Sequence, residues 1–301
     1  MPMTPTVFYH PLYSALPLPE HHRFPLAKYQ ALHQSLQSLP LRWQQANPIS
    51  REALTRIHEP TYVDALLQGS LDPLSLRRIG FPWSPLLLER TRLSVGATVM
   101  AARHACEEGC ALQISGGYHH AHRERGSGFC LFNDLVLAGD LMIAEGRAER
   151  VLICDLDVHQ GDGSATLCQG RDDIITLSLH AERNFPGNKA HSHLDFPLPD
   201  GMQDDAYLET LSQALELALC LYAPDLILYQ AGIDVHRDDE LGYLALSDEG
   251  VRQRDRFVFE TAQTRGIAIA AVPGGGYRRD WSALVPLHRI LFEEALACCL
   301  R

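Results

Sequence analysis

Long apolar runs and targeting signals are missing from this 301-residue sequence. No stretch of about 18 consecutive apolar residues occurs, and a transmembrane helix needs a run of roughly that length. The first five residues, Met1–Pro5, contain neither a basic segment nor the apolar segment that follows it in a secretory signal peptide. We therefore expect a cytoplasmic protein without a membrane span.

Paired cysteines and an excess of basic side chains are also missing. The eight cysteines include no C-x-x-C spacing, so we expect reduced thiols that mostly fill the core. The chain carries 26 basic and 37 acidic side chains, which gives a formal net charge of -11. This balance argues against a nucleic acid as partner and suits a neutral or cationic substrate better.

Internal repeats, low-complexity segments and a linker are absent, and strand and helix patterns alternate along the whole sequence. This alternation is typical of a parallel sheet with helices on both faces. We therefore predict one α/β domain over residues 1–301, with three αβα layers and a mainly parallel central sheet. The predicted strands are Thr6–Tyr9, Cys110–Ile114, Val151–Cys154, Ile174–Leu179, Leu226–Gln230 and Ile267–Val272. The predicted helices are Lys28–Leu39, Pro60–Leu67, Leu86–Glu107, Asn133–Ala144, Asp205–Tyr222, Ser247–Arg265 and Pro286–Leu300.

One stretch, Val151–Gly163, combines a buried strand with a cluster of polar side chains. Its first four residues are apolar, as in a strand that is buried on both faces. Asp155, Asp157 and His159 follow at a spacing of two, which in an extended chain places their side chains on one face. Carboxylates and an imidazole at the end of an apolar strand favour a metal site over aspartates that cap a turn.

Polar or glycine-rich segments follow four of the predicted strands. They are His119-His120, Asp157 with His159, Asp234, and Gly274-Gly275-Gly276-Tyr277. In a parallel sheet the carboxyl ends of the strands share one edge, and ligands bind there. Each segment says little alone, but together they supply the carboxylates, imidazoles and phenol that metal-assisted hydrolysis requires.

Five motifs resemble, in order, the zinc-dependent histone deacetylase superfamily, and the resemblance covers nearly the whole chain. They are Gly116–Ala121, Asp155–Gly163, Ser178–His180, Ala231–Asp234 and Pro273–Tyr277. The resemblance implies the arginase/deacetylase fold. Three further features are similar to the class IV branch and its bacterial relatives: His22–Pro25, Lys28-Tyr29, and Gln160 where other branches have a second histidine.

The resemblance implies a metal centre. Asp157, His159 and Asp234 match the family's zinc ligands, and ferrous iron is the alternative ion. The family also holds a potassium ion behind the zinc. The residues that match this second site are Asp155, Asp157, His159, Ser178 and the carbonyl of Leu179.

The resemblance also implies catalytic roles. His119 and His120 match the tandem histidines that move protons between water and the departing amine. Asp155 and Asp162 match the carboxylates that orient these imidazoles, His119 with Asp155 and His120 with Asp162. Tyr277 matches the tyrosine whose hydroxyl donates to the oxyanion.

A substrate tunnel is implied as well. Phe129 and Phe185 match its two aromatic walls. Gly128 lies beside the first of them, and Leu241 is expected at the rim. An apolar tube suits a lysine whose charge has been removed by acylation. We expect an amidohydrolase that removes acetyl or longer fatty acyl groups from lysine side chains of peptides or proteins, with acylated polyamines as the alternative substrate.

Two other functional classes are less consistent with these residues. A ureohydrolase of the arginase type shares the fold but binds two manganese ions, and its D-x-H-x-D segment needs an aspartate where Gly161 stands. A binding module that recognises acyl-lysine without cleaving it would not need the complete set of catalytic residues. Several neighbouring residues are expected to be ordinary core or surface residues: His122, His180, His191, His193, Cys130 and the solvated run Asp238-Asp239-Glu240.

Overall fold

A computed structural model describes residues 4–300, and its eight strands form one sheet in which every pair is parallel. The spatial order is β2-β1-β3-β8-β7-β4-β5-β6. The strands are β1 (Thr6–Tyr9), β2 (Arg42–Gln45), β3 (Cys110–Gln113), β4 (Val151–Asp155), β5 (Ile174–Ala181), β6 (Leu194–Leu198), β7 (Leu226–Gln230) and β8 (Ala268–Val272).

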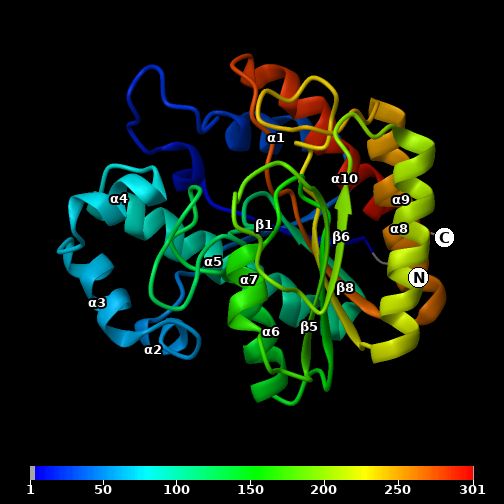
Figure 1. The fold of residues 1–301 in the computed structure, drawn as a ribbon, viewed down its shortest axis with the longest axis horizontal. Coiled ribbons are helices and arrows are strands. Elements are labelled where there is room, and N and C mark those ends of the chain that lie inside the picture. Colours follow the sequence, from blue (N-terminus) through cyan, green and yellow to red (C-terminus); the bar gives the residue numbers. More distant parts are fainter. Residues whose placement is uncertain (1–3, 301) are drawn as a thin grey trace.

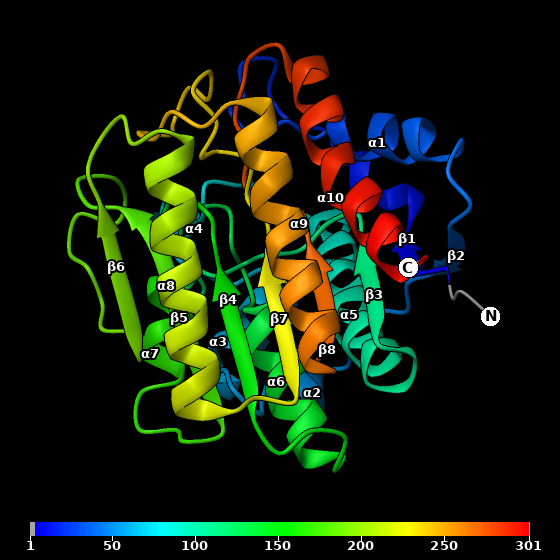
Figure 2. The same ribbon diagram turned by 90° about the vertical axis from the view of Figure 1, so that its right-hand side faces the viewer.

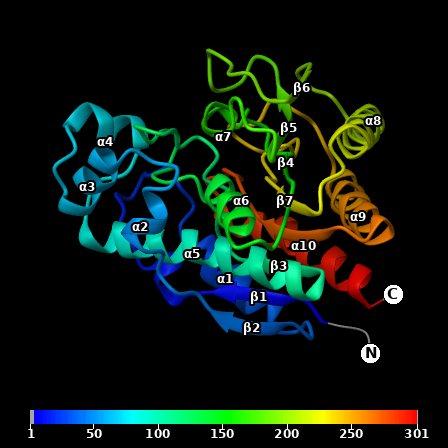
Figure 3. The same ribbon diagram turned by 90° about the horizontal axis from the view of Figure 1, so that it is seen from below.

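Helices cover both faces of the sheet (Figures 1 and 2). One face carries α5 (Pro85–Glu108), α6 (Asp134–Ala144) and α7 (Asp162–Leu167). The opposite face carries α1 (Lys28–Leu36), α8 (Asp204–Tyr222), α9 (Asp248–Arg265) and α10 (Leu284–Cys299). Seen from below, three short helices gather beside α5 (Figure 3): α2 (Arg51–Leu54), α3 (Pro60–Gln68) and α4 (Pro73–Ile79). Two 3-10 helices, η1 (Pro11–Ser14) and η2 (Trp281–Ala283), complete the elements. The predicted three-layer α/β class is confirmed.

The central strands are buried from end to end. Every residue of β4, β5 and β7 is inaccessible or nearly so. β4 and β7 are apolar on both faces up to their last residue, because helices cover both sides. In β5 the polar residues Thr176, Ser178 and His180 alternate with apolar ones and share one face. No helix within residues 4–300 is long and apolar enough to cross a membrane.

Capping residues set the ends of the two long helices that the sequence marks most clearly. Ser84 accepts a hydrogen bond from the Leu87 N–H at the start of α5, and Gly109 ends this helix with a φ of 87°. Ser247 accepts from the Gly250 N–H at the start of α9. Serine before the first turn and glycine after the last are residues that commonly cap helices.

The structure differs from the sequence-based elements at several places. Both edge strands, β2 and β6, were not predicted, because β2 is polar and largely exposed and β6 contains Pro197. The first helix ends at Leu36 rather than Leu39. The extended chain expected through His159 ends at Asp155, and α7 begins at Asp162.

The strand order explains how distant segments meet. The strands β3, β8, β7 and β4 are consecutive neighbours in the sheet. The segments with catalytic residue types follow these same four strands. Their carboxyl ends therefore bring the segments to one edge, as expected of a parallel sheet.

Candidate active site and metal centre

Three side chains at this edge form a compact ligand set. Asp157 and His159 lie in the loop after β4, and Asp234 lies in the loop after β7. One ligand atom from each lies within 4.8 Å of the other two. His159 Nδ1 is 3.0 Å from Asp157 Oδ1 and 3.2 Å from Asp234 Oδ2. All three residues are buried, and no other such group of three occurs within residues 4–300.

The ligand set fits a divalent cation. Asp234 Oδ2 is buried and finds no hydrogen bond of acceptable geometry among the described residues. Burial and the neighbouring Asp157 carboxylate raise the pKa of Asp234 to about 7. Two buried carboxylates this close are costly unless a cation or a proton lies between them. Two carboxylates and one imidazole are a donor set that zinc and ferrous iron accept.

Main-chain donors fix the orientation of the carboxylates. The N–H of Gly275 donates to Asp157 Oδ2 at 2.9 Å, and the N–H of Val158 donates to Asp234 Oδ1 at 3.0 Å. A Cβ atom at Gly275 would lie 2.0 Å from Asp234 Oδ2, so only glycine leaves room for both carboxylates here. Such outer contacts hold ligands in the geometry that a metal requires.

The tandem histidines each pair with a carboxylate. His119 Nδ1 lies 2.7 Å from Asp155 Oδ2, and His120 Nδ1 lies 2.7 Å from Asp162 Oδ1. The two rings are 4.1 Å apart. His119 Nε2 lies 3.9 Å from Asp157 Oδ1, so this ring borders the ligand set. With Nδ1 engaged, each imidazole keeps Nε2 for the chemistry of the site.

The surroundings shift the pKa values of His119 and His120 in opposite directions. Burial alone would lower the pKa of His119, but the carboxylates of Asp155 and Asp157 raise it to about 9. Burial and the charge of His119 lower the pKa of His120 to about 4, against the opposing effect of Asp162. The surroundings therefore favour the protonated form of His119 and the neutral form of His120.

Asp162 also contacts His122. His122 Nε2 lies 3.2 Å from Asp162 Oδ2, and its Nδ1 lies 2.8 Å from Thr166 Oγ1. His122 is thus a core residue that supports the carboxylate partner of His120. The other flanking histidines lie apart from the ligand set: His180 bonds Ser178, His193 bonds Thr176 and Arg171, and His191 is exposed.

Tyr277 lines a small cavity beside the ligand set. This cavity has a volume of about 20 Å³, and its lining includes Asp157, both tandem histidines, Phe129 and Tyr277. The Tyr277 ring lies 6.2 Å from the His159 ring and 5.9 Å from the Phe129 ring. Burial and the Asp157 and Asp234 carboxylates raise the pKa of the phenol, which keeps its proton for donation.

The predicted tunnel residues surround His120 and the cavity. The Phe185 ring packs edge-on against the His120 ring at 4.8 Å. Gly128 has a φ of 50°, and a Cβ atom there would lie 2.7 Å from His120 Cδ2. Phe129 lines the cavity, whereas Phe185 is 42% exposed and is not among the residues that line it. Leu241 is partly buried, and its carbonyl accepts from Asn184 Nδ2 at 2.7 Å.

The residues expected around potassium lie on adjacent strands. Asp155 on β4 is the register partner of Ser178 on β5. Asp155 Oδ1 accepts from the Asp157 N–H at 3.2 Å, and Ser178 Oγ lies 3.0 Å from His180 Nδ1. The structure thus places Asp155 and Ser178 side by side on neighbouring strands.

Sequence reasoning missed several residues that shape the site. Asp134, the first residue of α6, accepts hydrogen bonds from the N–H groups of Gly117 and Tyr118 at 2.9 and 2.7 Å. Gln230 donates to the Gly117 carbonyl at 3.1 Å. These side chains hold the segment before the tandem histidines. The only sequence signal for Asp134 is its place after the helix cap Asn133.

Lys28 and Asp239 were also missed. Lys28 is buried and lines the cavity, and burial lowers its pKa to about 8. Asp239, expected in a solvated loop, instead accepts a hydrogen bond from the Tyr277 N–H at 2.6 Å. The expectation for the run Asp238-Asp239-Glu240 is therefore wrong at its middle residue, because tertiary structure turns this carboxylate inward.

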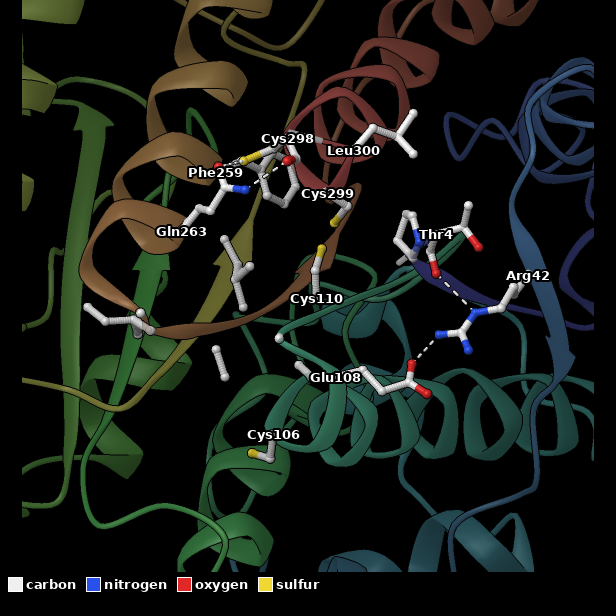
Figure 4. Close-up of a pocket in the computed structure, with 17 residues that line it drawn as sticks. Thr4, Arg42, Cys106, Glu108, Cys110, Phe259, Gln263, Cys298, Cys299 and Leu300 are labelled. Carbon is white, nitrogen blue, oxygen red and sulfur yellow. Dashed lines mark hydrogen bonds and ion pairs between the residues drawn. The ribbon is translucent and has the colours of Figure 1, made fainter. Parts of the chain in front are cut away.

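A large cavity at the opposite edge of the sheet is separate from the site. Its volume is about 680 Å³, and it lies where β3 and β8 begin (Figure 4). Four cysteines line it: Cys106, Cys110, Cys298 and Cys299. None of the residues with expected catalytic roles contributes to its lining.

Comparison with known proteins adds an independent line of argument. A family model described as the histone deacetylase domain matches residues 22–285. An uncharacterized protein of Picosynechococcus sp. is 44% identical over 293 residues, which cover 96% of this chain and 97% of that protein. Histone deacetylase B of Dictyostelium discoideum is 30% identical over 90% of this chain and 67% of its own length. Histone deacetylase 2 of Arabidopsis thaliana is 36% identical over 64% of this chain, and the match spans about half (51%) of the plant protein.

The family match and the fold agree. The matched range contains β3, β4, β7 and β8, the four strands whose loops form the site. The parallel sheet between helical layers is of the arginase/deacetylase type that the sequence motifs imply. This chain therefore belongs to the histone deacetylase family.

Proposed function

We propose that this protein is a zinc-dependent deacetylase that removes acetyl groups from lysine side chains. The observation that carries the proposal is the meeting of a metal ligand set with two carboxylate-paired histidines at one edge of the sheet. Structural potassium behind the zinc and a cytoplasmic location remain parts of the same proposal.

Different residues of the chain have different roles in the proposed reaction. A bound zinc ion would act as a Lewis acid toward the acyl carbonyl and toward water. Neutral His120, oriented by Asp162, accepts the proton of the attacking water at Nε2. Protonated His119, oriented by Asp155, supplies a proton to the departing amine. The Tyr277 hydroxyl donates to the carbonyl oxygen as negative charge develops there.

The cavity favours a short acyl group. Its free volume of about 20 Å³ is close to the space of a single water molecule. Its lining includes the buried side chains of Phe24, Lys28 and Tyr29. We therefore favour acetyl over the longer fatty acyl groups that the class IV resemblance suggests.

The rim favours an acylated lysine over an acylated polyamine. A polyamine needs acidic side chains that no other cation neutralises. Here Glu240 pairs with Arg23 at 3.1 Å, and Arg278 lies 3.7 Å from Asp238. The rim carboxylates are thus already engaged by arginines.

Two observations argue against the alternative classes. A Cβ atom at Gly161 would lie 2.3 Å from Asp155 Oδ2, so the aspartate of an arginase-type second metal site cannot be accommodated. The histidines, their carboxylate partners and the tyrosine expected to act in hydrolysis are all present around the ligand set. A module that only binds acyl-lysine would not need them.

A panel of substrates tests the proposal. Zinc-loaded protein is assayed with lysine peptides that carry acetyl, butyryl, octanoyl or myristoyl groups, and with acetylated polyamines. We expect kcat/KM to be highest for acetyl-lysine and to fall with chain length. A preference for myristoyl-lysine or for polyamines would overturn the substrate assignment, and absence of turnover on all of them would favour the binding module.

A further inference from the structure

The main chain of Tyr277 is held on both sides by one short segment. The Tyr277 N–H donates to Asp239 Oδ2 at 2.6 Å. The Glu240 N–H donates to the Tyr277 carbonyl at 3.0 Å. The segment that follows the metal ligand Asp234 therefore fixes the backbone from which the phenol projects.

The Asp239 carboxylate bridges two loops. While Oδ2 accepts from Tyr277, Oδ1 accepts from the N–H groups of Leu241 and Gly242 at 2.8 and 2.9 Å. The chain before Tyr277 consists of three glycines, of which Gly274 and Gly276 have φ values of 58° and 149°. Glycine leaves this loop free to adopt other conformations, so an external anchor is needed to hold it.

We propose that Asp239 is the positioning residue for the Tyr277 hydroxyl. This inference rests on the proposed deacetylase function, in which the hydroxyl donates to the oxyanion. Asp239 touches neither the ligand set nor the substrate in this role. It acts by fixing the Tyr277 backbone, and the loss of its contact would leave the phenol misplaced.

Kinetics of Asp239→Asn provide the first test. The amide retains one acceptor oxygen but cannot satisfy all three N–H donors of the two loops. We expect kcat for an acetyl-lysine peptide to fall by on the order of tenfold to a hundredfold, with KM changed less than about twofold. In the Tyr277→Phe background the same substitution should have no further effect. An equal loss in both backgrounds, or loss of bound zinc, would overturn the positioning role.

Hydrogen exchange provides a test that does not depend on turnover. The Tyr277 amide should exchange markedly faster in Asp239→Asn than in the wild type. Unchanged exchange would refute the inference even if the enzyme is active, whereas an inactive wild type would refute only the proposed function. Asp238→Asn is the matched control, because that side chain is half exposed and lies beside Arg278. It should change neither exchange nor kcat.

A second inference concerns the thiols of the large cavity, and it is independent of the proposed function. Cys110 begins β3 and Cys299 ends α10, and their sulfur atoms face each other in Figure 4. The two thiols lie close enough to shift each other's pKa. Cys298 turns instead to Gln263, whose Oε1 lies 3.0 Å from its sulfur. Cys110 is buried, whereas Cys299 is partly exposed at the cavity wall.

We infer that Cys110 and Cys299 form a modification site for hydroperoxides. The Cys299 sulfur attacks one peroxide oxygen, the O–O bond breaks, and the other oxygen leaves as water or alcohol. Cys299 is then a sulfenic acid. The Cys110 sulfur attacks it, the S–O bond breaks, a water leaves, and a disulfide forms. Two thiols lose two electrons, which the hydroperoxide takes up.

The difference in exposure and the pKa shifts of the two thiols support the order of these steps. The Cys110 thiol lowers the pKa of Cys299, which favours the thiolate on the more accessible sulfur. The pKa of Cys110 is raised by the same contact and by burial, as suits the thiol that reacts second.

Mass spectrometry of the whole chain tests this inference. One equivalent of hydrogen peroxide should remove two hydrogen atoms from the intact mass, and dithiothreitol should restore them. Non-reducing peptide mapping should link Cys110 to Cys299, and Cys298→Ser should leave this link intact. In Cys110→Ser, dimedone should label Cys299. A Cys298–Cys299 link, oxidation of Cys299 without a link, or no reaction would each overturn the inference.

Discussion

At the scale of single residues, the chemistry depends on environments that differ between neighbours. His119 and His120 are adjacent in sequence and have similar carboxylate contacts, at 2.7 Å each. Only His119 also borders Asp157, and its pKa is raised while that of His120 is lowered. The position of each imidazole relative to the ligand set therefore suits His119 to act as the acid and His120 as the base in the proposed reaction.

Tyr277→Phe tests the proposed oxyanion donor. The substitution removes only the hydroxyl, so the ligand set should stay intact. We expect kcat to fall by about 10²- to 10³-fold, in line with the roughly 3 to 4 kcal/mol of a lost oxyanion donor. Steady-state kinetics and metal analysis measure the two quantities. Unchanged kinetics would remove Tyr277 from the mechanism.

His58 predicts a pH dependence of stability. Its Nε2 accepts from the Asn133 N–H at 3.0 Å, and its Nδ1 lies 2.9 Å from the His122 carbonyl, so the native ring is neutral. Burial lowers the pKa of His58 to about 4, whereas a histidine in the unfolded chain titrates near about 6.5. The unfolded state therefore binds more protons between these values. The stability that neutral His58 provides is complete above about pH 6.5 and is lost as the pH falls toward about 4.

Urea denaturation of the wild type and of His58→Gln tests the direction of this pH dependence. Glutamine has an acceptor for the Asn133 N–H but no proton to gain. We expect the free energy of unfolding to fall more steeply in the wild type than in the variant between about pH 7 and about pH 5. Parallel pH profiles would show that His58 does not titrate on unfolding.

At the scale of elements, helices and loops act together on the site. The first residue of α6, Asp134, holds the Gly117 and Tyr118 N–H groups at the entrance to the tandem histidines. The same carboxylate accepts from Thr98 Oγ1 of α5 at 2.5 Å. One buried side chain thereby joins two helices to the loop after β3.

Asp134→Ala tests this connection. The change leaves buried N–H and hydroxyl donors without a partner, so we expect the free energy of unfolding to fall by about 3 kcal/mol and kcat to fall about tenfold. Asp140→Ala is the control on the same helix, because Asp140 pairs with Arg56 and Arg171 away from the site. It should lower stability and leave kcat unchanged. Equal kcat in both variants would argue against the role of Asp134.

At the scale of the whole molecule, the sequence predicts the parallel architecture and the segments at the strand ends well. Apolar strands such as β4 and β7 are visible because both faces are buried, and their following motifs are local in sequence. The polar edge strand β2 escaped prediction because it lacks that signal. Asp134, Gln230 and Asp239 escaped because their contacts are made across 16 to 113 positions of sequence.

Removal of the metal should destabilise the whole fold. The ligand set draws Asp157 and Asp234 from loops after two different strands, and both carboxylates are buried. A cation that binds only the folded state stabilises it in proportion to its occupancy. We expect chelation to lower the Tm by about 5 to 10 °C and one equivalent of zinc to restore it. An identical Tm with and without chelator would contradict a resident ion.

The central claim is that one cation, held by Asp157, His159 and Asp234, supports hydrolysis of acetyl-lysine. Its most direct test is a titration of metal-depleted protein with zinc while turnover of an acetyl-lysine peptide is followed. Turnover should rise linearly and level off at one zinc per chain, and His159→Ala should neither bind the ion nor turn over. Turnover without zinc, a requirement for two ions, or full activity of His159→Ala would contradict the account.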